Sequence, residues 1–278
     1  MEIKAVVIDL DGTLLSSDKK ISRRSLKAIE ILIKNHIPLI IASARPPRTV
    51  KYLLPEEIYS SAIKVYYNGA MIVSEQLGIN LHFAIDSVIS SLILDYLIKN
   101  EENHWLSIEV EDKWYSYKDL NYQSIMKVKS NPVTITLDEF RKMQPTKMLL
   151  SNLNSLESLN SLFGNRTNII HTDSNQLTQI MRKNISKEYA VNVISDKLGI
   201  SLNSIVVFGD DLNDLGLFKM CGYPVAMGNA VEELKNLAKD ITETNDNDGV
   251  AKVLEVLFNY EQELWTEKDW CPSLLNIL

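Results

Sequence analysis

The sequence predicts an α/β protein in which a doubly wound parallel sheet is interrupted by an inserted α+β domain. Two observations carry this prediction. Toward both ends of the chain, short and continuous apolar runs alternate with amphipathic segments of helical spacing. In the middle of the chain, strand-like segments alternate apolar and polar residues instead. Continuous apolar runs are typical of parallel strands buried on both faces, whereas alternation is typical of antiparallel strands with one face in water.

The elements of the parallel core are predicted from these runs and from local capping signals. KAVVID at 4–9 is a buried strand that ends in a carboxylate. Ser22 precedes a helical pattern and is a favourable helix cap. PLIIAS at 38–43 is a second strand, and a proline-started helix follows Arg45. The remaining expected elements are a strand with an Asn-Gly turn at 64–72, strands at 204–210 and 223–228, and helices at 231–239 and 249–258.

The inserted domain is indicated by a change of pattern between about 82 and 184. WLSIEVEDKWYSYKD at 105–119 alternates as an antiparallel pair would, and helical segments at 87–99 and 155–163 are interleaved with such strands. Because continuous apolar runs resume after the insertion, the first domain is expected to be discontinuous. We expect residues 1–81 and 185–278 to form the core and residues 82–184 to form the inserted domain.

Composition excludes several classes of function. A net charge of −7 argues against a surface that binds nucleic acid or anionic membranes. No apolar run reaches the roughly 18 residues that a membrane span needs, and the amino terminus lacks the apolar segment of a secretory signal. The two cysteines show no disulfide framework. We therefore expect a cytoplasmic protein, a monomer or weak homodimer, with neither nucleic acid nor membrane as a partner.

The strongest chemical signal is DLDGTL at 9–14, directly after the first predicted strand. Ligands of open α/β sheets bind at the carboxyl ends of the strands. Asp9 and Asp11 can share a metal ion there, and Gly12 permits a sharp turn that brings backbone amides near a phosphate. The structural alternative is a polar turn whose aspartates cap a helix.

A second acidic motif, GDDLNDL at 209–215, follows another buried strand. It crowds the carboxylates of Asp210, Asp211 and Asp214 into five residues. Without a cation these charges repel one another, and a hard divalent ion relieves that repulsion. Taken alone, the motif fits a capped helix equally well. Its pairing with DLDGTL on a second strand end favours the metal site.

Two further residues are candidates for contacts with a phosphate. Ser43 ends the second strand, where its hydroxyl can donate to a phosphoryl oxygen, although a helix cap or turn is the common role of such a serine. Lys187 follows Ser186 at a predicted helix start, where the helix dipole disfavours a cation. That position is explained if Lys187 faces an anion, and the alternative is a solvated surface lysine.

Seven segments in order carry a resemblance to a known family. They are DLDGTL, IIASARPP, YYNGAMI, NISKEYAV, VVFGDDLNDLGLF, VAMGNA and NDNDGVA. Over nearly all of residues 1–80 and 185–258 the chain resembles the Cof-type branch of the haloacid dehalogenase-like hydrolases. The resemblance implies a Rossmann-like core, a cap domain that closes over the site, magnesium as the cofactor and hydrolysis of a phosphoester.

The same resemblance implies a role for each matching residue. Asp9 would be the nucleophile and a metal ligand. Asp11 would be the general acid and base and would offer its backbone carbonyl to the metal. Asp210 would be the third protein ligand, and Asp214 would act on metal-bound water. The transferring phosphoryl group would be held by Lys187, Ser43, Asn213 and the backbone amides of Leu10 and Ala44.

Two positions depart from the family pattern, which has glycine where this chain has Ala44 and Glu188. Neither departure removes a catalytic group. The expected function is a magnesium-dependent phosphatase that hydrolyses a small phosphorylated metabolite, such as a sugar phosphate, through an aspartyl-phosphate. The alternatives are a phosphomutase of related fold and a non-catalytic regulator that binds metal or phosphate.

Two apolar features complete the analysis. The aromatic residues of the insert, at 105, 114, 115 and 117, are expected to pack within the cap sheet, with a platform for substrate as the alternative. The carboxyl-terminal segment 261–278 carries Trp265 and Trp270, an apolar load that we expect to pack on the core or on a second copy.

Overall fold

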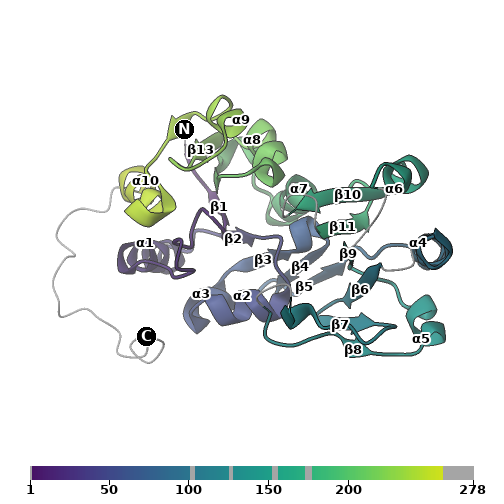
Figure 1. The fold of residues 1–278 in the computed structure, drawn as a ribbon. Helices are drawn as coiled ribbons and strands as arrows, with labels where there is room; N and C mark the ends of the chain where they lie inside the picture. The colour runs from purple at the N-terminus through teal and green to yellow at the C-terminus, as the bar shows by residue number, and fades with distance from the viewer. Residues whose placement is uncertain (1, 101–103, 125–127, 152–155, 173–176, 259–278) are drawn as a thin grey trace.

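The computed structural model describes residues 2–258, apart from 101–103, 125–127, 152–155 and 173–176. These residues form a large and a small β-sheet, each with its own helices (Figure 1). The segment 261–278 lies outside the described residues, so its packing stays a prediction. In the part of the chain that is described, no helix is long and apolar enough to cross a membrane.

The large sheet has eight strands in the order β14-β13-β12-β1-β2-β3-β4-β5. It is parallel from β14 to β3, and β4 and β5 continue it antiparallel. The mainly parallel core predicted from the apolar runs is therefore confirmed. Its strands are β1 (Ala5–Asp9), β2 (Leu39–Ala42), β3 (Ile63–Tyr66), β4 (Met71–Ser74), β5 (Ile79–His82), β12 (Ile205–Gly209), β13 (Tyr223–Ala226) and β14 (Asp240–Ile241).

Helices lie on both sides of this sheet. One layer contains α10, α1 and α3, and the other contains α7, α8 and α9 (Figure 1). Ser22 caps α1 as predicted, by accepting a hydrogen bond from the backbone N–H of Ser25 at 3.0 Å. The helices are α1 (Arg23–Lys34), α2 (Pro47–Leu53), α3 (Glu56–Ser61), α7 (Lys187–Leu198), α8 (Leu215–Met220), α9 (Glu232–Lys235) and α10 (Gly249–Leu257).

Two expected elements differ from the structure. In the segment 64–72 the expected turn at Asn68-Gly69 is confirmed by the 3-10 turn Tyr67–Gly69, but the chain beyond it forms a separate antiparallel strand, β4. Tyr67 and Asn68 both have a positive φ, of 54° and 52°, which no strand can contain. The helix expected at 231–239 is only the four residues of α9, because the chain turns out of it to form β14.

The small sheet has six strands in the order β10-β11-β9-β6-β7-β8. All neighbours are antiparallel except β7 and β8, so the alternating pattern predicted this sheet correctly. Its strands are β6 (Trp105–Val110), β7 (Lys113–Ser116), β8 (Val133–Thr134), β9 (Lys147–Ser151), β10 (Thr167–Thr172) and β11 (Leu177–Arg182). Its helices are α4 (Ser87–Asn100), α5 (Leu137–Lys142) and α6 (Leu156–Phe163).

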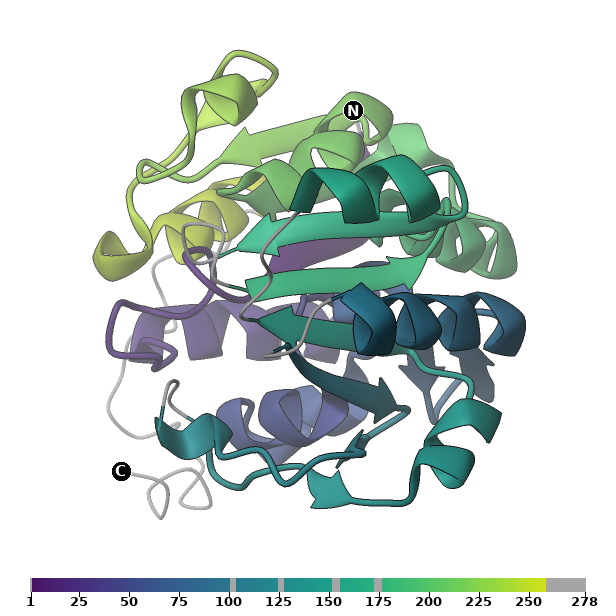
Figure 2. The same cartoon turned by 45° about the vertical axis from the view of Figure 1, so that its right-hand side comes forward.

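These three helices cover one face of the small sheet, the face turned away from the large sheet (Figures 1 and 2). Leu106 and Ile108 of β6 are fully buried in the apolar core under the helices. Because side chains alternate along a strand, Ser107 and Glu109 point to the opposite face, toward the large sheet. These two sheets support our proposal to divide the chain into a core, 1–81 with 185–278, and a cap, 82–184.

Candidate active site

The central strands of the large sheet bring the two acidic motifs together. Parallel pairing sets Ile8 of β1 opposite Phe208 of β12, so Asp9 and Asp210 emerge at the same sheet edge. Asp214 lies in the 3-10 turn Leu212–Asp214 that follows β12. One carboxylate oxygen from each of the three aspartates lies within 4.8 Å of the others. The cluster therefore presents converging oxygen atoms, the ligand type that hard divalent cations take.

Lys187 is the cation at the centre of this cluster. It is the first residue of α7, follows the capping Ser186 and has no solvent exposure. Its Nζ donates to Asp9 Oδ1 at 2.5 Å and to Asp214 Oδ1 at 2.8 Å. Burial by itself lowers the pKa of Lys187, but the charges of Asp214 and Asp9 outweigh burial and raise it above its ordinary value. Lys187 therefore stays protonated, and its placement is that of a cation facing anions rather than a solvated side chain.

The three acids differ in how free they are to hold a metal ion. Asp214 accepts from Lys187 with one oxygen and from the backbone N–H of Asp210 with the other, at 3.2 Å. Among the described residues, Asp9 uses only its Oδ1 in a hydrogen bond with Lys187. Asp210 accepts from the hydroxyl of Thr13 at 2.9 Å and is partly exposed. The residues fit a divalent cation held by Asp9 and Asp210, with Asp214 holding Lys187 in place.

The surroundings of this cluster favour the protonated form of two of its carboxyl groups. Burial raises the pKa of Asp9 above the ordinary 3.8, and the charges of Asp214 and Asp210 add to this rise against the opposing charge of Lys187. Burial also raises the pKa of Asp210, to about 6. A bound cation favours the ionised carboxylates, so metal binding must expel these protons.

We therefore expect Mg²⁺ binding to release protons at pH 6. Below pH 6 each displaced proton should weaken the apparent affinity by up to about tenfold per pH unit. The measurement is calorimetric titration with Mg²⁺ in two buffers of different ionisation enthalpy. Identical enthalpies in the two buffers would contradict the prediction. Asp210→Asn, which cannot hold this proton as a carboxylic acid, should reduce the difference between the buffers.

Gly12 and Thr13 determine where the Asp210 side chain lies. Gly12 has a φ of +79°, and a Cβ added there would lie 2.1 Å from Asp210 Oδ2. Only glycine therefore permits both the turn and the close approach of the carboxylate. Sequence reasoning had assigned the turn to Gly12 but had given no role to Thr13, whose hydroxyl orients Asp210.

Asp11 is held by two cations. Arg45 donates to both of its carboxylate oxygens, at 2.5 and 2.7 Å, and Lys19 donates to Oδ1 at 2.8 Å. Burial alone would raise the pKa of Asp11, but the hydrogen bonds from Arg45 and Lys19 outweigh it and hold the pKa below 3.8. Sequence reasoning missed both cations. Arg45 lies within the IIASARPP motif, two residues after Ser43, whereas Lys19 belongs to none of the quoted motifs.

The predicted phosphate-binding residues lie along the same edge. The buried Ser43 follows β2, and its Oγ accepts from the backbone N–H of Arg45 at 3.1 Å. Asn213 donates to Asn68 Oδ1 at 3.2 Å. Leu10 and Ala44 directly follow Asp9 and Ser43, so their amides occupy adjoining strand ends. The structure brings all of these positions to one sheet edge.

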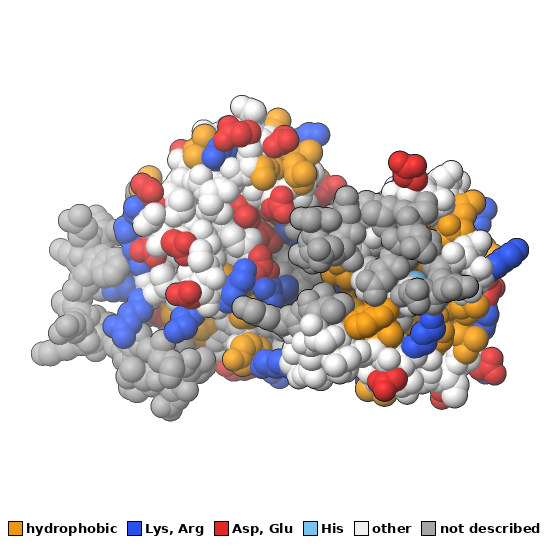
Figure 3. Space-filling model, viewed as in Figure 1, with side chains coloured by type: hydrophobic (Ala, Val, Ile, Leu, Met, Phe, Trp, Pro, Cys, Tyr) orange, Lys and Arg blue, Asp and Glu red, His pale blue; other side chains and the backbone are white. Residues whose placement is uncertain are grey.

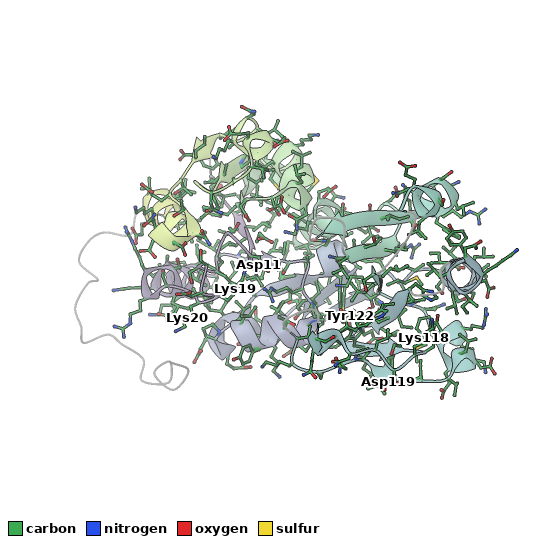
Figure 4. All side chains as sticks on the ribbon, viewed as in Figure 1. Asp11, Lys19, Lys20, Lys118, Asp119 and Tyr122 are labelled. Atoms are coloured by element: carbon green, nitrogen blue, oxygen red, sulfur yellow. The ribbon has the colours of Figure 1, made fainter. Side chains whose placement is uncertain are left out.

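The cap lies next to the core (Figure 3). Acidic and basic side chains gather on the part of the core that borders the cap (Figure 3). Asp11 and Lys19 lie on the core side of the view with sticks, and Tyr122 lies on the cap side (Figure 4). The buried Tyr122 packs against the rings of Trp105 and Trp114, with centroids 5.3 and 4.9 Å away.

The aromatic cluster of the insert is thus divided between two faces. Tyr115 and Tyr117 contact the apolar core under the cap helices, so packing is confirmed for them. Trp114 is paired in register with Glu109 and shares its face, toward the large sheet. Trp105 lies on that face as well, four residues before Glu109 on the same strand. The two tryptophans pack on Tyr122, on the face of the cap sheet turned toward the large sheet.

Comparison with known proteins agrees with this architecture. Residues 6–254 match the family model of the haloacid dehalogenase-like hydrolases. A putative phosphatase of Haemophilus influenzae is 30% identical, over 93% of this chain and 99% of its own length. A 5-amino-6-(5-phospho-D-ribitylamino)uracil phosphatase of Bacillus subtilis is 28% identical, over 91% and 95%. A crystal structure from Thermotoga maritima superposes with a TM-score of 0.83 at 27% identity, over 91% and 97%.

The fold and the match along the chain define a hydrolase with an α/β core and an inserted cap. The chain belongs to the haloacid dehalogenase-like hydrolases, as its motifs implied. Relatives that match along nearly their whole length are named phosphatases, in agreement with the enzyme class expected from the sequence, a phosphoric monoester hydrolase.

Proposed function

We propose that this protein is a magnesium-dependent phosphatase that hydrolyses a small phosphorylated metabolite through an aspartyl-phosphate on Asp9. The observation that carries the proposal is the buried contact of Lys187 with Asp9 and Asp214, beside Asp210 at the same sheet edge. A phosphate monoester repels an attacking carboxylate. Catalysis therefore needs cations placed where the two anions meet.

Mg²⁺, held by Asp9, Asp210 and the backbone carbonyl of Asp11, would supply charge neutralisation for the phosphoryl oxygens. Lys187 would supply a second positive charge. Because Lys187 is fully buried, this charge acts out of contact with solvent. Ser43, Asn213 and the amides of Leu10 and Ala44 would orient the phosphoryl group for in-line attack by Asp9.

Asp11 is proposed as the general acid and base. Its contacts with Arg45 and Lys19 favour the ionised form of the carboxyl group. The phosphate of a substrate competes for these two cations. Once they turn to the phosphate, burial dominates the environment of Asp11 and its pKa rises, so it can carry the proton that the leaving alkoxide requires.

The proposed reaction has two steps, formation and hydrolysis of the aspartyl-phosphate. In the first, Asp9 forms a bond to phosphorus, the ester oxygen leaves, and Asp11 gives that oxygen its proton. In the second, Asp11 takes a proton from water, the water oxygen attacks phosphorus, and Asp9 is released with inorganic phosphate. A phosphomutase would instead return the phosphoryl group to substrate, and it would need a bisphosphate activator.

For the substrate we propose a phosphomonoester whose leaving group carries hydroxyls. The Bacillus subtilis relative is named for a substrate with a phosphorylated ribityl chain, which is such a compound. The cap adds a physical reason, because its face toward the core contains an acceptor and a donor, Glu109 and Lys147, beside the ring of Trp114. Sugar phosphates belong to the same chemical class.

Metal dependence tests the proposed function. With p-nitrophenyl phosphate as the substrate, Mg²⁺ should support hydrolysis and EDTA should abolish it. Ca²⁺ should substitute poorly, because its looser and larger coordination shell misplaces the nucleophile. Release of p-nitrophenol is followed by absorbance. Full activity after exhaustive chelation would show that the acidic cluster is not a catalytic metal site.

A further inference from the structure

A buried ion pair lies on the face of the cap sheet that is turned toward the catalytic edge. Glu109 of β6 and Lys147 of β9 are partners in register. Glu109 is only 3% exposed and Lys147 only 6%. Their charged atoms, Glu109 Oε1 and Lys147 Nζ, are 3.5 Å apart, longer than the 2.7–3.2 Å of an ordinary hydrogen bond between nitrogen and oxygen.

Glu109 is anchored by the core through its other oxygen. Oε2 accepts from the hydroxyl of Tyr67 at 2.9 Å and lies 2.6 Å from Nη1 of Arg48. Both of these residues belong to the core, at the end of β3 and in α2. The carboxylate is therefore held in place by Tyr67 and Arg48, and it does not depend on Lys147 for its position or for charge neutralisation.

The ammonium of Lys147 has fewer hydrogen-bond acceptors around it than it has hydrogens to donate. An ammonium has three hydrogens to donate. Among the described residues its contacts are Glu109 Oε1 at 3.5 Å and the ring of Tyr67, whose centroid is 5.1 Å from Nζ. Burial lowers the pKa of Lys147, against the opposing effect of Glu109. A buried ammonium with unused donors is costly unless a ligand supplies acceptors.

Tyr67 connects Lys147 with the loops of the proposed phosphate site. Asn68, the next residue, donates its backbone N–H to the carbonyl of Ser43 at 2.9 Å and accepts from Asn213 at 3.2 Å. The backbone N–H of Tyr67 donates to the carbonyl of Arg45 at 3.3 Å. Tyr67 therefore contacts the Glu109–Lys147 pair through its side chain and the Ser43–Arg45 loop through its backbone, and it joins the two.

The turn that creates this arrangement is strained. Tyr67 and Asn68 are consecutive residues in the left-handed region, a conformation that is unfavourable above all for a bulky residue such as Tyr67. This turn directs Asn68 to the loops of the proposed phosphate site and the Tyr67 hydroxyl to the cap. Such conformations persist where the surrounding contacts require them, and here those contacts join the site to the Glu109–Lys147 pair.

We infer that Lys147, together with Glu109, determines substrate specificity by binding a hydroxyl group of the leaving group. The inference rests on the proposed phosphatase function. A hydroxyl can accept from the Lys147 ammonium and donate to Glu109 Oε1, so it satisfies both members of the pair. A carboxylate cannot donate to Glu109 and is repelled by it, and an apolar group leaves the ammonium without an acceptor.

The test compares leaving groups with and without hydroxyls, in saturating Mg²⁺. The hydroxylated probes are D-ribose 5-phosphate, D-glucose 6-phosphate and glycerol 3-phosphate. The others are p-nitrophenyl phosphate and phosphoglycolate. For Lys147→Met, kcat/KM for the best hydroxylated probe should fall at least about tenfold relative to that for p-nitrophenyl phosphate, mainly through KM. Lys147→Gln, which keeps a donor, should show a smaller change in the same ratio.

Lys113→Met is the matched control. Lys113 lies on β7 of the same sheet, is exposed, and belongs to the opposite face by alternation with Trp114. Its substitution should leave the ratio unchanged. Equal loss on every substrate in Lys147→Met would assign Lys147 a purely structural role and overturn the inference. A greater loss on phosphoglycolate than on the hydroxylated probes would also overturn it.

The wild-type enzyme separates this inference from the proposed function. If it hydrolyses p-nitrophenyl phosphate but none of the hydroxylated probes, the phosphatase assignment stands and the inference about Lys147 fails. If it hydrolyses no phosphomonoester in the set with Mg²⁺ present, the proposed function itself fails.

Discussion

Replacing Asp9 with alanine is expected to lower kcat for p-nitrophenyl phosphate by at least about two orders of magnitude, because it removes the proposed nucleophile. Asp11→Asn should cause a loss of similar size for a different reason. An asparagine keeps the size of the side chain but cannot transfer the proton. The measurement is steady-state turnover with saturating Mg²⁺, after circular dichroism has shown that each variant is folded.

The two variants should differ in covalent chemistry. Acid quenching with a ³²P-labelled substrate should trap no phosphoprotein in Asp9→Ala, since the acceptor carboxylate is missing. In Asp11→Asn, any labelled protein that forms should persist, because the base that activates water is absent. Asp211→Asn is the matched control, since Asp211 is an exposed aspartate in the same acidic motif and belongs to no part of the proposed machinery. A fully active Asp9→Ala would show that the nucleophile lies elsewhere.

Removing Lys187 is expected to damage both stability and activity. Lys187→Met fills a similar volume but leaves Asp9 and Asp214 as uncompensated buried carboxylates. Breaking one partner out of a buried charge network typically costs about 3–5 kcal/mol of unfolding free energy. The rate should fall at least about 100-fold, because a preorganised positive charge at the phosphoryl group is lost. Urea denaturation and turnover in saturating Mg²⁺ measure the two effects.

A second substitution distinguishes charge from packing. Asp214→Asn added to Lys187→Met removes one of the orphaned charges, so the double variant should be more stable than Lys187→Met alone. Lys197→Met, at an exposed position of the same helix, should change the unfolding free energy by less than about 0.5 kcal/mol. If Lys187→Met unfolds at the same urea concentration as wild type, the buried ion pairs contribute nothing to stability.

The pattern of apolar runs was sufficient to predict the core and the sheet edge at which the acidic motifs meet. Strands that are buried on both faces belong to a parallel sheet, and parallel strands end at one edge. Asp9 and Asp210 could therefore be placed together although they lie far apart in the chain. At 64–72 the Asn-Gly pair predicted a turn, and the chain does turn there. The positive φ of Tyr67, just before that pair, could not be predicted, because its side chain is typical of a strand.

Contacts between side chains from distant segments could not be predicted in the same way. The helix start at Ser186 suggested that Lys187 faces an anion, but only the folded chain sets its ammonium between Asp9 and Asp214. Arg45 stood in a quoted motif, yet nothing in its spacing indicated a two-point contact with Asp11. Such contacts depend on the angle at which loops leave adjoining strands, and that angle leaves no periodic trace in the sequence.

The sequence by itself determined the α/β core, the inserted cap and the acidic residues proposed for catalysis, because burial and strand direction follow from local patterns of residue type, and the resemblance of its motifs gave the family. Tertiary structure alone decided which face of the cap meets the core. It thereby decided which polar groups of the cap are turned toward the core. Glu109 and Lys147 are unremarkable charges in an alternating sequence, and they become a buried pair only when β6 and β9 align above Tyr67. Selection of a substrate depends on such long-range alignment, because it needs groups from separate elements at fixed distances.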